Sequence, residues 1–174
     1  MAGPQQRFEG SRIPDPGFAG DDGTADPALE AALAAYRSGT ADRAGVLAAL
    51  GSARLLVPVV ALAGSVEYDD EGLAHDKTSD MAAVLLTRPD GRRALLAFAS
   101  TASLAAWDPE ARPVPVAAAT AAQAAIQEQA DALLLDVAGP VRYAVEGKDL
   151  HGVAAGWRLA RVANRSAWIR PASE

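Results

Sequence analysis

Three consecutive pieces of the sequence decide the fold class: Met81-Ala-Ala-Val-Leu-Leu-Thr87, Arg88-Pro-Asp-Gly-Arg92 and Arg93-Ala-Leu-Leu-Ala-Phe98. Two apolar runs of strand length flank a short polar turn. Pro89 and Asp90 suit the two inner positions of a type I turn, and Gly91 accepts the positive φ that follows them. We therefore predict a β-hairpin over residues 81–98.

Further strands are predicted on both sides of this hairpin. Apolar runs of strand length cover residues 54–62, 132–136 and 141–145, whereas the prolines of residues 112–116 make that stretch extended. Pro58 has no amide hydrogen, so we expect it on a sheet edge or at a place where the ladder leaves that side unpaired.

Helices are predicted where apolar residues recur at helical spacing between capping signals. Asp26-Pro27 begins the first helix and Gly39 ends it, whereas Thr40 is expected to cap a second helix that stops at Gly51. The other predicted helices cover residues 102–107, 117–130 and 148–155. These elements predict an α+β fold, with a mixed or antiparallel sheet of about five strands and helices packed against it.

The composition excludes several classes of function. The chain has 174 residues, of which 42 are alanine, and it contains no cysteine. Disulfides, thiolate nucleophiles and cysteine-ligated zinc are therefore excluded. The formal net charge of −6 opposes general binding to phosphate backbones, so nucleic acid is an unfavourable partner.

Three regions are expected along the chain. Residues 1–25 are rich in Gly and Pro without apolar spacing, and we predict a flexible N-terminal tail. Residues 26–155 form the α+β domain, and residues 156–174 form a C-terminal segment that carries Arg and Trp. The N-terminus lacks a secretory pattern and the apolar stretch Leu55–Val66 is too short to cross a bilayer, so we expect a cytoplasmic protein without a membrane partner.

The order and spacing of seven segments resemble the N-terminal domain of the SseB family (enhanced serine sensitivity protein B), a type seen in many bacteria and often in actinobacteria. The segments are Arg54-Leu-Leu-Val-Pro-Val-Val60, Asp80-Met-Ala-Ala-Val84, Asp90-Gly-Arg92 leading into Ala97-Phe-Ala-Ser-Thr101, Leu104-Ala-Ala-Trp107, Ala111-Arg-Pro-Val-Pro-Val116, Ala130-Asp-Ala-Leu-Leu-Leu-Asp136 and Gly139-Pro-Val141. The resemblance covers about Pro27 to Ala155.

Two positions depart from the family pattern, because Leu96 and Val137 stand where a proline is expected. These departures concern loop geometry rather than chemistry. The resemblance implies a compact α/β-type domain and carries no established catalytic residue, so no active site is transferred from it. The separate C-terminal domain of some family members is not expected in this chain.

Metal and triad chemistry are unfavoured by the spacing of the candidate residues. The acidic loop Gly64–Ser79 places its acids consecutively, without the alternation and the closing Glu of a calcium loop; its members are Glu67, Asp69, Asp70, Glu71, His75 and Asp76. His75 and His151 lie apart from any Gly-x-Ser-x-Gly elbow. We expect no metal, no cofactor and no hydrolytic triad.

The backbone amides of Ser100–Ser103 can cradle an anion where a helix opens, but ordinary capping by Ser100 or Thr101 is the favoured interpretation. Trp107 follows an amphipathic turn and is expected in or beside the core.

The C-terminal segment carries the candidate interaction residues, which are Trp157, Arg158, Arg161, Arg165 and Trp168. If this segment is helical, its arginines share one face and form a basic, aromatic strip suited to an acidic protein or to nucleic acid. The alternative is that one Trp packs on the domain and the arginines are simply solvated.

Two functions follow as hypotheses. The first is a non-catalytic adaptor or regulatory module that binds a protein partner through the sheet edge near Pro58, the loop Gly64–Ser79 or the C-terminal strip. The second is a small-ligand binder or enzyme that uses Asp and Arg side chains, with Asp80 or Asp136 in acid–base chemistry. A pocket lined by convergent polar groups favours the second.

Overall fold

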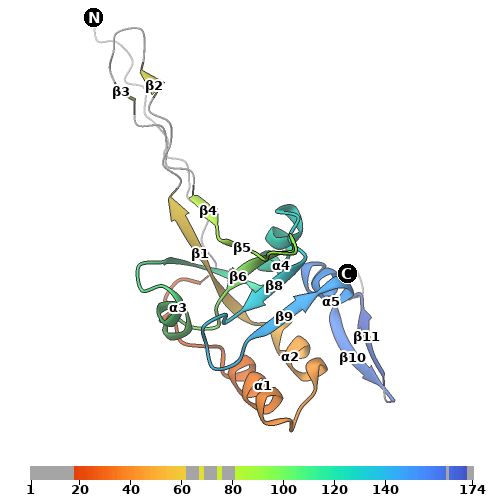
Figure 1. Ribbon diagram of the computed structural model, residues 1–174. Coiled ribbons are helices and arrows are strands. Elements are labelled where there is room, and N and C mark those ends of the chain that lie inside the picture. Colours follow the sequence, from red (N-terminus) through yellow and green to blue (C-terminus); the bar gives the residue numbers. More distant parts are fainter. Residues whose placement is uncertain (1–17, 62–66, 69–73, 76–80, 164, 172–174) are drawn as a thin grey trace, which may run out of the picture.

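A computed structural model describes residues 18–61, 67–68, 74–75, 81–163 and 165–171 (Figure 1). Its main sheet has four strands in the order β5-β6-β8-β9. Their bounds are β5 (Leu85–Thr87), β6 (Arg93–Ala97), β8 (Ala132–Leu135) and β9 (Tyr143–Glu146). β6 and β8 run parallel and the other pairs are antiparallel, so the sheet is mixed and the predicted α+β class is confirmed.

Within the hairpin predicted over residues 81–98, the two strands that flank the turn are β5 and β6. Arg88 donates its amide to the carbonyl of Arg92 at 2.8 Å, and Gly91 has a φ of +83° as the turn requires. The first half of the predicted strand 81–87 belongs to a second sheet, whose strand order is β4-β1-β7. Its strands are β4 (Met81–Ala83), β1 (Arg54–Ala61) and β7 (Arg112–Ala117).

Two backbone contacts join the two sheets. Leu56 and Phe98 exchange amide-to-carbonyl hydrogen bonds of 2.8 Å in both directions. Between β4 and β5, the amide of Val84 reaches the carbonyl of Pro58 at 3.3 Å, while its carbonyl accepts from Leu96 at 3.1 Å. A single predicted strand therefore serves both sheets, and it changes partner at Val84.

Pro58 occupies a different place from the predicted sheet edge. β1 lies between β4 and β7, so Pro58 is on a central strand, where it is fully buried. Its partner across the ladder is Pro113, and neither residue has an amide hydrogen to satisfy. The carbonyl of Pro58 accepts the Val84 amide, so the Pro58 nitrogen also faces β4, where the Val84 carbonyl accepts from Leu96 instead. The missing amide hydrogen leaves no acceptor unpaired, which agrees with the second alternative expected from the sequence, a place where the ladder is unpaired on that side. The edge near Pro58 is thereby removed as a docking place.

The first two helices follow their capping residues. α1 (Pro27–Ser38) begins at Asp26, whose carboxylate accepts the amides of Ala28 and Leu29, and ends at Gly39 with φ +74°, as predicted. α2 (Arg43–Leu50) is capped by Asp42 rather than Thr40, which corrects that prediction. The hydroxyl of Thr40 instead donates back to the carbonyl of Ala35 at 3.2 Å, because it still belongs to the end of α1.

The remaining helices are α3 (Thr101–Trp107), α4 (Ala118–Gln127) and α5 (Gly147–Ala154). Ser100 caps α3 in a capping box with Ser103, which confirms the predicted role of the serine. The capping interpretation accounts for the Ser103 amide, because the Ser100 hydroxyl accepts it at 3.1 Å.

Alternating residues of the central strands supply two hydrophobic clusters, one on each face. The larger cluster contains Leu55, Leu95 and Leu133 together with residues of α1, α2, α4 and α5. The smaller one contains Leu56, Leu96, Phe98 and Leu104, and α3 covers it. Trp107 packs on this smaller cluster with its ring stacked 5.5 Å from that of Phe98, in agreement with its predicted place beside the core.

Two predicted regions are described only in part. In the acidic loop, β2 (Glu67–Tyr68) pairs antiparallel with β3 (Ala74–His75), and the other loop residues lie outside the described residues. Within the predicted N-terminal tail, residues 18–25 are described. The carbonyl of Gly23 accepts the amide of Thr101 at 2.8 Å, so this part of the tail contacts the start of α3.

Candidate functional site

The C-terminal candidate residues lie on a β-hairpin. β10 (Arg158–Val162) pairs antiparallel with β11 (Arg165–Ile169) in a two-stranded sheet that follows α5 (Figure 1). The helix considered from the sequence is therefore wrong. A hairpin sends alternate residues to opposite faces, so Arg158 and Arg165 share one face while Arg161 points to the other.

The inner face of this hairpin packs on the domain. Leu159 and Trp168 are directly opposite each other and both pack against the larger hydrophobic cluster. The indole of Trp168 lies on Gly152 of α5, where any Cβ atom would overlap the ring. Its Nε1 donates to the carboxylate of Asp149 at 3.0 Å. One tryptophan of the candidate strip is thus an anchor and is not available to a partner.

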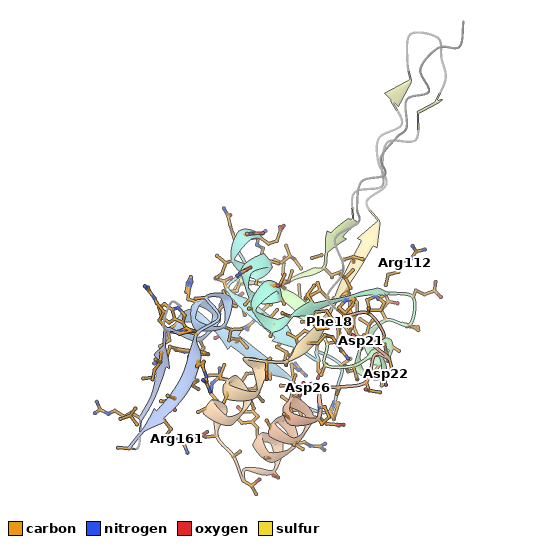
Figure 2. All side chains as sticks on the ribbon, turned by 180° about the vertical axis from the view of Figure 1, so that it is seen from behind. Phe18, Asp21, Asp22, Asp26, Arg112 and Arg161 are labelled. Carbon is orange, nitrogen blue, oxygen red and sulfur yellow. The ribbon has the colours of Figure 1, made fainter. Side chains whose placement is uncertain are left out.

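Arg161 is also engaged within the domain. Its guanidinium forms an ion pair with the carboxylate of Asp42, the residue that caps α2. Both side chains are more than half exposed to solvent, so the pair contributes little to stability, about 0–1 kcal/mol. Figure 2 shows Arg161 on the hairpin, at the opposite end of the molecule from Arg112 on β7.

The opposite side of the hairpin faces solvent, and we call it the outer face. It consists of three cross-strand pairs: Arg158 with Ile169, Ala160 with Ala167, and Val162 with Arg165. Val162 is 64% exposed and Ile169 is 48% exposed, which makes them two of the most exposed large apolar residues in the described part of the chain. Each exposed aliphatic side chain has an arginine directly across from it.

Trp157 lies at the base of the hairpin and is half-buried. Its amide donates to the carbonyl of Gly152 at 3.0 Å, and the guanidinium of Arg170 lies 5.7 Å from its ring centroid. This cation–π contact places Arg170, the fourth arginine of the segment, beside Trp157 at the base of the hairpin.

Electrostatically, the hairpin is a cationic region on an acidic protein. Residues 156–171 contain four arginines and no acidic residue, whereas the whole chain has a net charge of −6. Arg161 is compensated by Asp42, so the excess of positive charge is concentrated on the outer face and at Arg170.

A second candidate site surrounds Asp136, which the sequence also indicated. Asp136 follows β8 directly and is buried, with only 4% of its surface exposed. Its carboxylate accepts the amide of Ala99, beyond the end of β6, at 2.9 Å. Burial raises the pKa of Asp136, while the hydroxyl of Ser103 and the amide of Ala99 oppose this shift.

Removing the carboxylate of Asp136 leaves the Ala99 amide without an acceptor, so Asp136→Ala is expected to lower the free energy of unfolding by about 2 kcal/mol. Part of this loss comes from the backbone, because residue 136 has a φ of +49°, which Ala tolerates poorly. Asp136→Asn keeps an acceptor and tolerates this φ, so we expect little loss. Urea unfolding of the three proteins measures the difference.

The raised pKa of Asp136 makes the stability of the protein depend on pH in a definite direction. Because the folded-state pKa of Asp136 is raised above 3.8, ionised Asp136 costs stability at neutral pH. This cost disappears as the pH falls through the folded-state pKa, since the folded protein binds the proton first. Wild type should therefore gain stability relative to Asp136→Asn between about pH 7 and pH 4. If the difference in stability between wild type and Asp136→Asn did not change over this pH range, the raised pKa of Asp136 would be contradicted.

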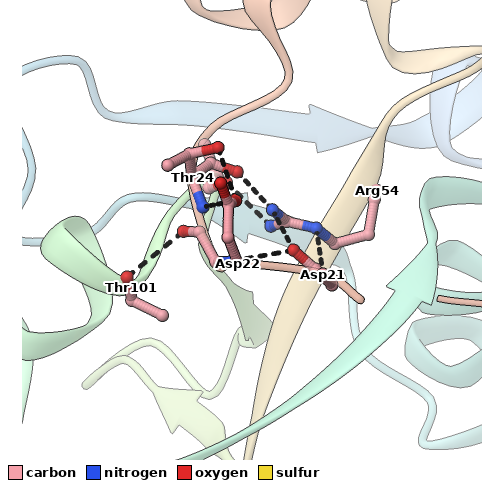
Figure 3. A network of polar contacts seen from close by, with 7 residues as sticks. Asp21, Asp22, Thr24, Arg54 and Thr101 are labelled. Carbon is pink, nitrogen blue, oxygen red and sulfur yellow. Dashed lines mark hydrogen bonds and ion pairs between the residues drawn. The ribbon is translucent and has the colours of Figure 1, made fainter. Parts of the chain in front are cut away.

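A third polar cluster holds residues 21–24 against the domain (Figure 3). Arg54, at the start of β1, pairs with Asp21 at 2.7 Å, and the two side chains are 11% and 14% exposed. The guanidinium also donates to the carbonyl of Ala99 at 3.0 Å and to that of Thr24. Hydrogen bonds from Thr24 lower the pKa of the exposed Asp22 beside it. We assign this cluster a structural role, because its charges are mutually satisfied.

The other candidates from the sequence carry no site in the described residues. Asp80 and the loop acids Asp69, Asp70, Glu71 and Asp76 lie outside those residues. Glu67 of β2 pairs with His75 of β3, and His151 is exposed on α5. Among the residues that the structure describes, no group of three His, Asp or Glu side chains is arranged to hold a metal ion. Within that same part of the chain, no helix has the length and apolar character needed to span a membrane.

The geometry defines the molecule as an α+β domain with an appended cationic hairpin. The family model of the SseB protein N-terminal domain matches residues 29–152, more than half of the chain, and the chain belongs to this family. No curated protein and no solved structure gives a match. The matched region ends within α5, so the hairpin lies beyond the part shared with the family model.

Proposed function

We propose that this chain is a non-catalytic adaptor or regulatory module, and that the outer face of its C-terminal hairpin binds an acidic, extended segment of another protein. The observation that carries this proposal is the pairing of exposed Val162 and Ile169 with Arg165 and Arg158. A cytoplasmic location is part of the proposal, since a chain without cysteine folds without disulfides in a reducing compartment.

Charge complementarity favours an acidic partner. The two outer-face arginines lie on the two strands of the hairpin, and opposite charges across an interface raise the association rate and select the partner. An extended segment with alternating acidic and apolar residues presents all its acids on one face, at the same two-residue period, so that face can meet Arg158 and Arg165.

The strand edges support an extended partner as well. Within the described residues, β10 and β11 pair only with each other, so each strand has one side without a neighbouring strand. Such an edge offers backbone amides and carbonyls to an added strand. Main-chain hydrogen bonds then supply affinity and the outer-face side chains supply specificity.

Charge reversal tests the proposal. The probe is a fluorescent ten-residue peptide in which Glu and Val alternate, and binding to the full chain is measured by fluorescence anisotropy at low salt. We expect R158E/R165E to weaken binding at least about tenfold, because two attractive contacts become repulsive. Binding by the wild type should also weaken as salt rises.

The matched control is R112E/R142E, which makes the same charge change at two exposed arginines outside the hairpin. It should bind the peptide like the wild type. Equal weakening by both double variants would reduce the effect to net charge and contradict the proposal. Preferential binding of a single-stranded oligonucleotide over the peptide, or self-association of the chain through this face, would also overturn it.

A further inference from the structure

A cavity of about 440 Å³ lies between α1 and the ends of the central strands, apart from the hairpin. It opens where β6 and β8, the parallel pair of the main sheet, both reach their carboxyl ends. In open sheets this end of parallel strands is the usual position of a ligand. The volume lies within the usual range for small-molecule sites, about 300–1,000 Å³.

The floor of the cavity is held in place by hydrogen bonds from several directions. Ala99 donates its amide to Asp136 at 2.9 Å, and its carbonyl accepts from Arg54 at 3.0 Å. The amide of Asp136 in turn reaches the carbonyl of Ala97 at 3.0 Å. A floor fixed in this way needs no ordering when a ligand binds, which favours affinity.

The polar groups of the floor mainly offer acceptors. The hydroxyl of Ser103 donates to the carbonyl of Ser100 at 3.0 Å, and that of Ser100 lies 3.3 Å from the Ser103 oxygen. Both hydroxyls form hydrogen bonds within the floor, and that of Ser103 also opposes the pKa rise of Asp136. A carboxylate offers about four acceptor positions, so Asp136 retains capacity beyond its contacts with Ala99 and Ser103. A ligand must supply the donor.

The walls and the rim define the rest of the ligand. Leu33 and Ala34 of α1 line the cavity together with Pro140 and Val141 of the β8–β9 connection, and these apolar side chains suit a short aliphatic body. The charged lining residues are Glu30 and Arg37, which together with Asp136 give an excess of one negative charge. This excess favours a cationic head over an anionic one.

We propose that this cavity binds a small aliphatic ammonium ligand, with its charged nitrogen donating to Asp136 and its aliphatic body between α1 and the β8–β9 connection. The site is independent of the proposed docking of an acidic protein segment, because the cavity and the outer face share no residue.

Three probes that share an isopropyl body but differ in the charge of the head test the proposal on the full chain: isobutylammonium, isobutyramide and isobutyrate. Backbone ¹H–¹⁵N spectra are recorded during each titration at constant ionic strength. We expect saturable shifts of the Ala99, Ser103 and Val141 amides with isobutylammonium, at least tenfold tighter than with isobutyrate. Equal binding of isobutyramide would overturn the cationic head, and binding of none of the three would overturn the site.

Two variants connect the binding to the cavity. Ala34→Trp places a large side chain at the cavity wall, whereas Ala31→Trp makes the same change at an exposed position of α1 that does not line it. We expect at least a tenfold loss of affinity in the first and none in the second. Asp136→Asn, which keeps the acceptor for Ala99, should also lose at least tenfold. Equal affinity in Ala34→Trp and Ala31→Trp would overturn the proposal.

Discussion

Arg54→Met is expected to lower the free energy of unfolding by about 3 kcal/mol, because it breaks an ion pair whose two side chains are largely buried. The substitution leaves the carboxylate of Asp21, which is only 14% exposed, without its partner. It also removes the donors for the carbonyls of Ala99 and Thr24. Removing one member of a buried pair is costly because the other charge stays desolvated.

Equilibrium unfolding in urea measures this loss. Arg112→Met, at an exposed position of β7, is the control and should change stability by no more than about 0.5 kcal/mol. The double variant Arg54→Met/Asp21→Asn should lose less than the sum of the single changes, because the second removes the uncompensated charge. A loss below about 1 kcal/mol for Arg54→Met would mean that residues 21–24 do not support the fold.

Trp168→Ala is the second large change, and it should weaken the attachment of the hairpin by about 3 kcal/mol. The substitution removes the ring that lies on Gly152 and the hydrogen bond to Asp149, and it exposes Leu159 across the strand. The effect is local, since a two-stranded hairpin has little stability of its own. Protection of the hairpin amides from hydrogen exchange should fall by a factor of about 100.

Trp157→Ala is the matched control for this experiment. Trp157 is half-buried like Trp168, but its ring lies next to Arg170, whose guanidinium is 5.7 Å from the ring centroid. We expect a loss below about 1 kcal/mol and little change in exchange over residues 158–169. If both tryptophan variants release the hairpin equally, Trp168 is not its specific anchor.

The turn of the central hairpin and the ends of α1 were predictable because their signals are local. Pro89, Asp90 and Gly91 specify a turn by their own backbone preferences, and Asp26 and Gly39 specify the ends of α1 in the same way. The change of sheet at Val84 has no such signal. The change of sheet depends on which strand lies beside each half of residues 81–87. The apolar residues of this run can pair with β1 as well as with β6.

The C-terminal hairpin was missed for a physical reason. Its connection contains Ala163, which takes a φ of +53° although alanine has no preference for that region. The strands are rich in Ala and Arg, which favour helices in isolation. The pattern of Leu159 and Trp168 on one face becomes meaningful only once Gly152 is known to lie beneath the indole.

The candidate sites were predictable to different degrees. Asp136 was named from the sequence only as one of two acids for acid–base chemistry, and its place in one cavity with Glu30 and Arg37 depends on the packing of α1 against the strand ends. Of the proposed C-terminal strip, Arg158 and Arg165 remain together on the outer face. Arg161 and Trp168 face the domain, as the alternation of a strand dictates.

The docking surface is tested most directly by hydrogen–deuterium exchange of the full chain with and without the alternating Glu–Val peptide. The account predicts slower exchange at the amides of residues 158–162 and 165–169, by at least fivefold, with the remaining amides unchanged. R158E/R165E should abolish this protection. Two results would contradict the assignment of the outer face as the binding surface. The first is slower exchange only at amides outside these two strands, and the second is slower exchange that persists in R158E/R165E.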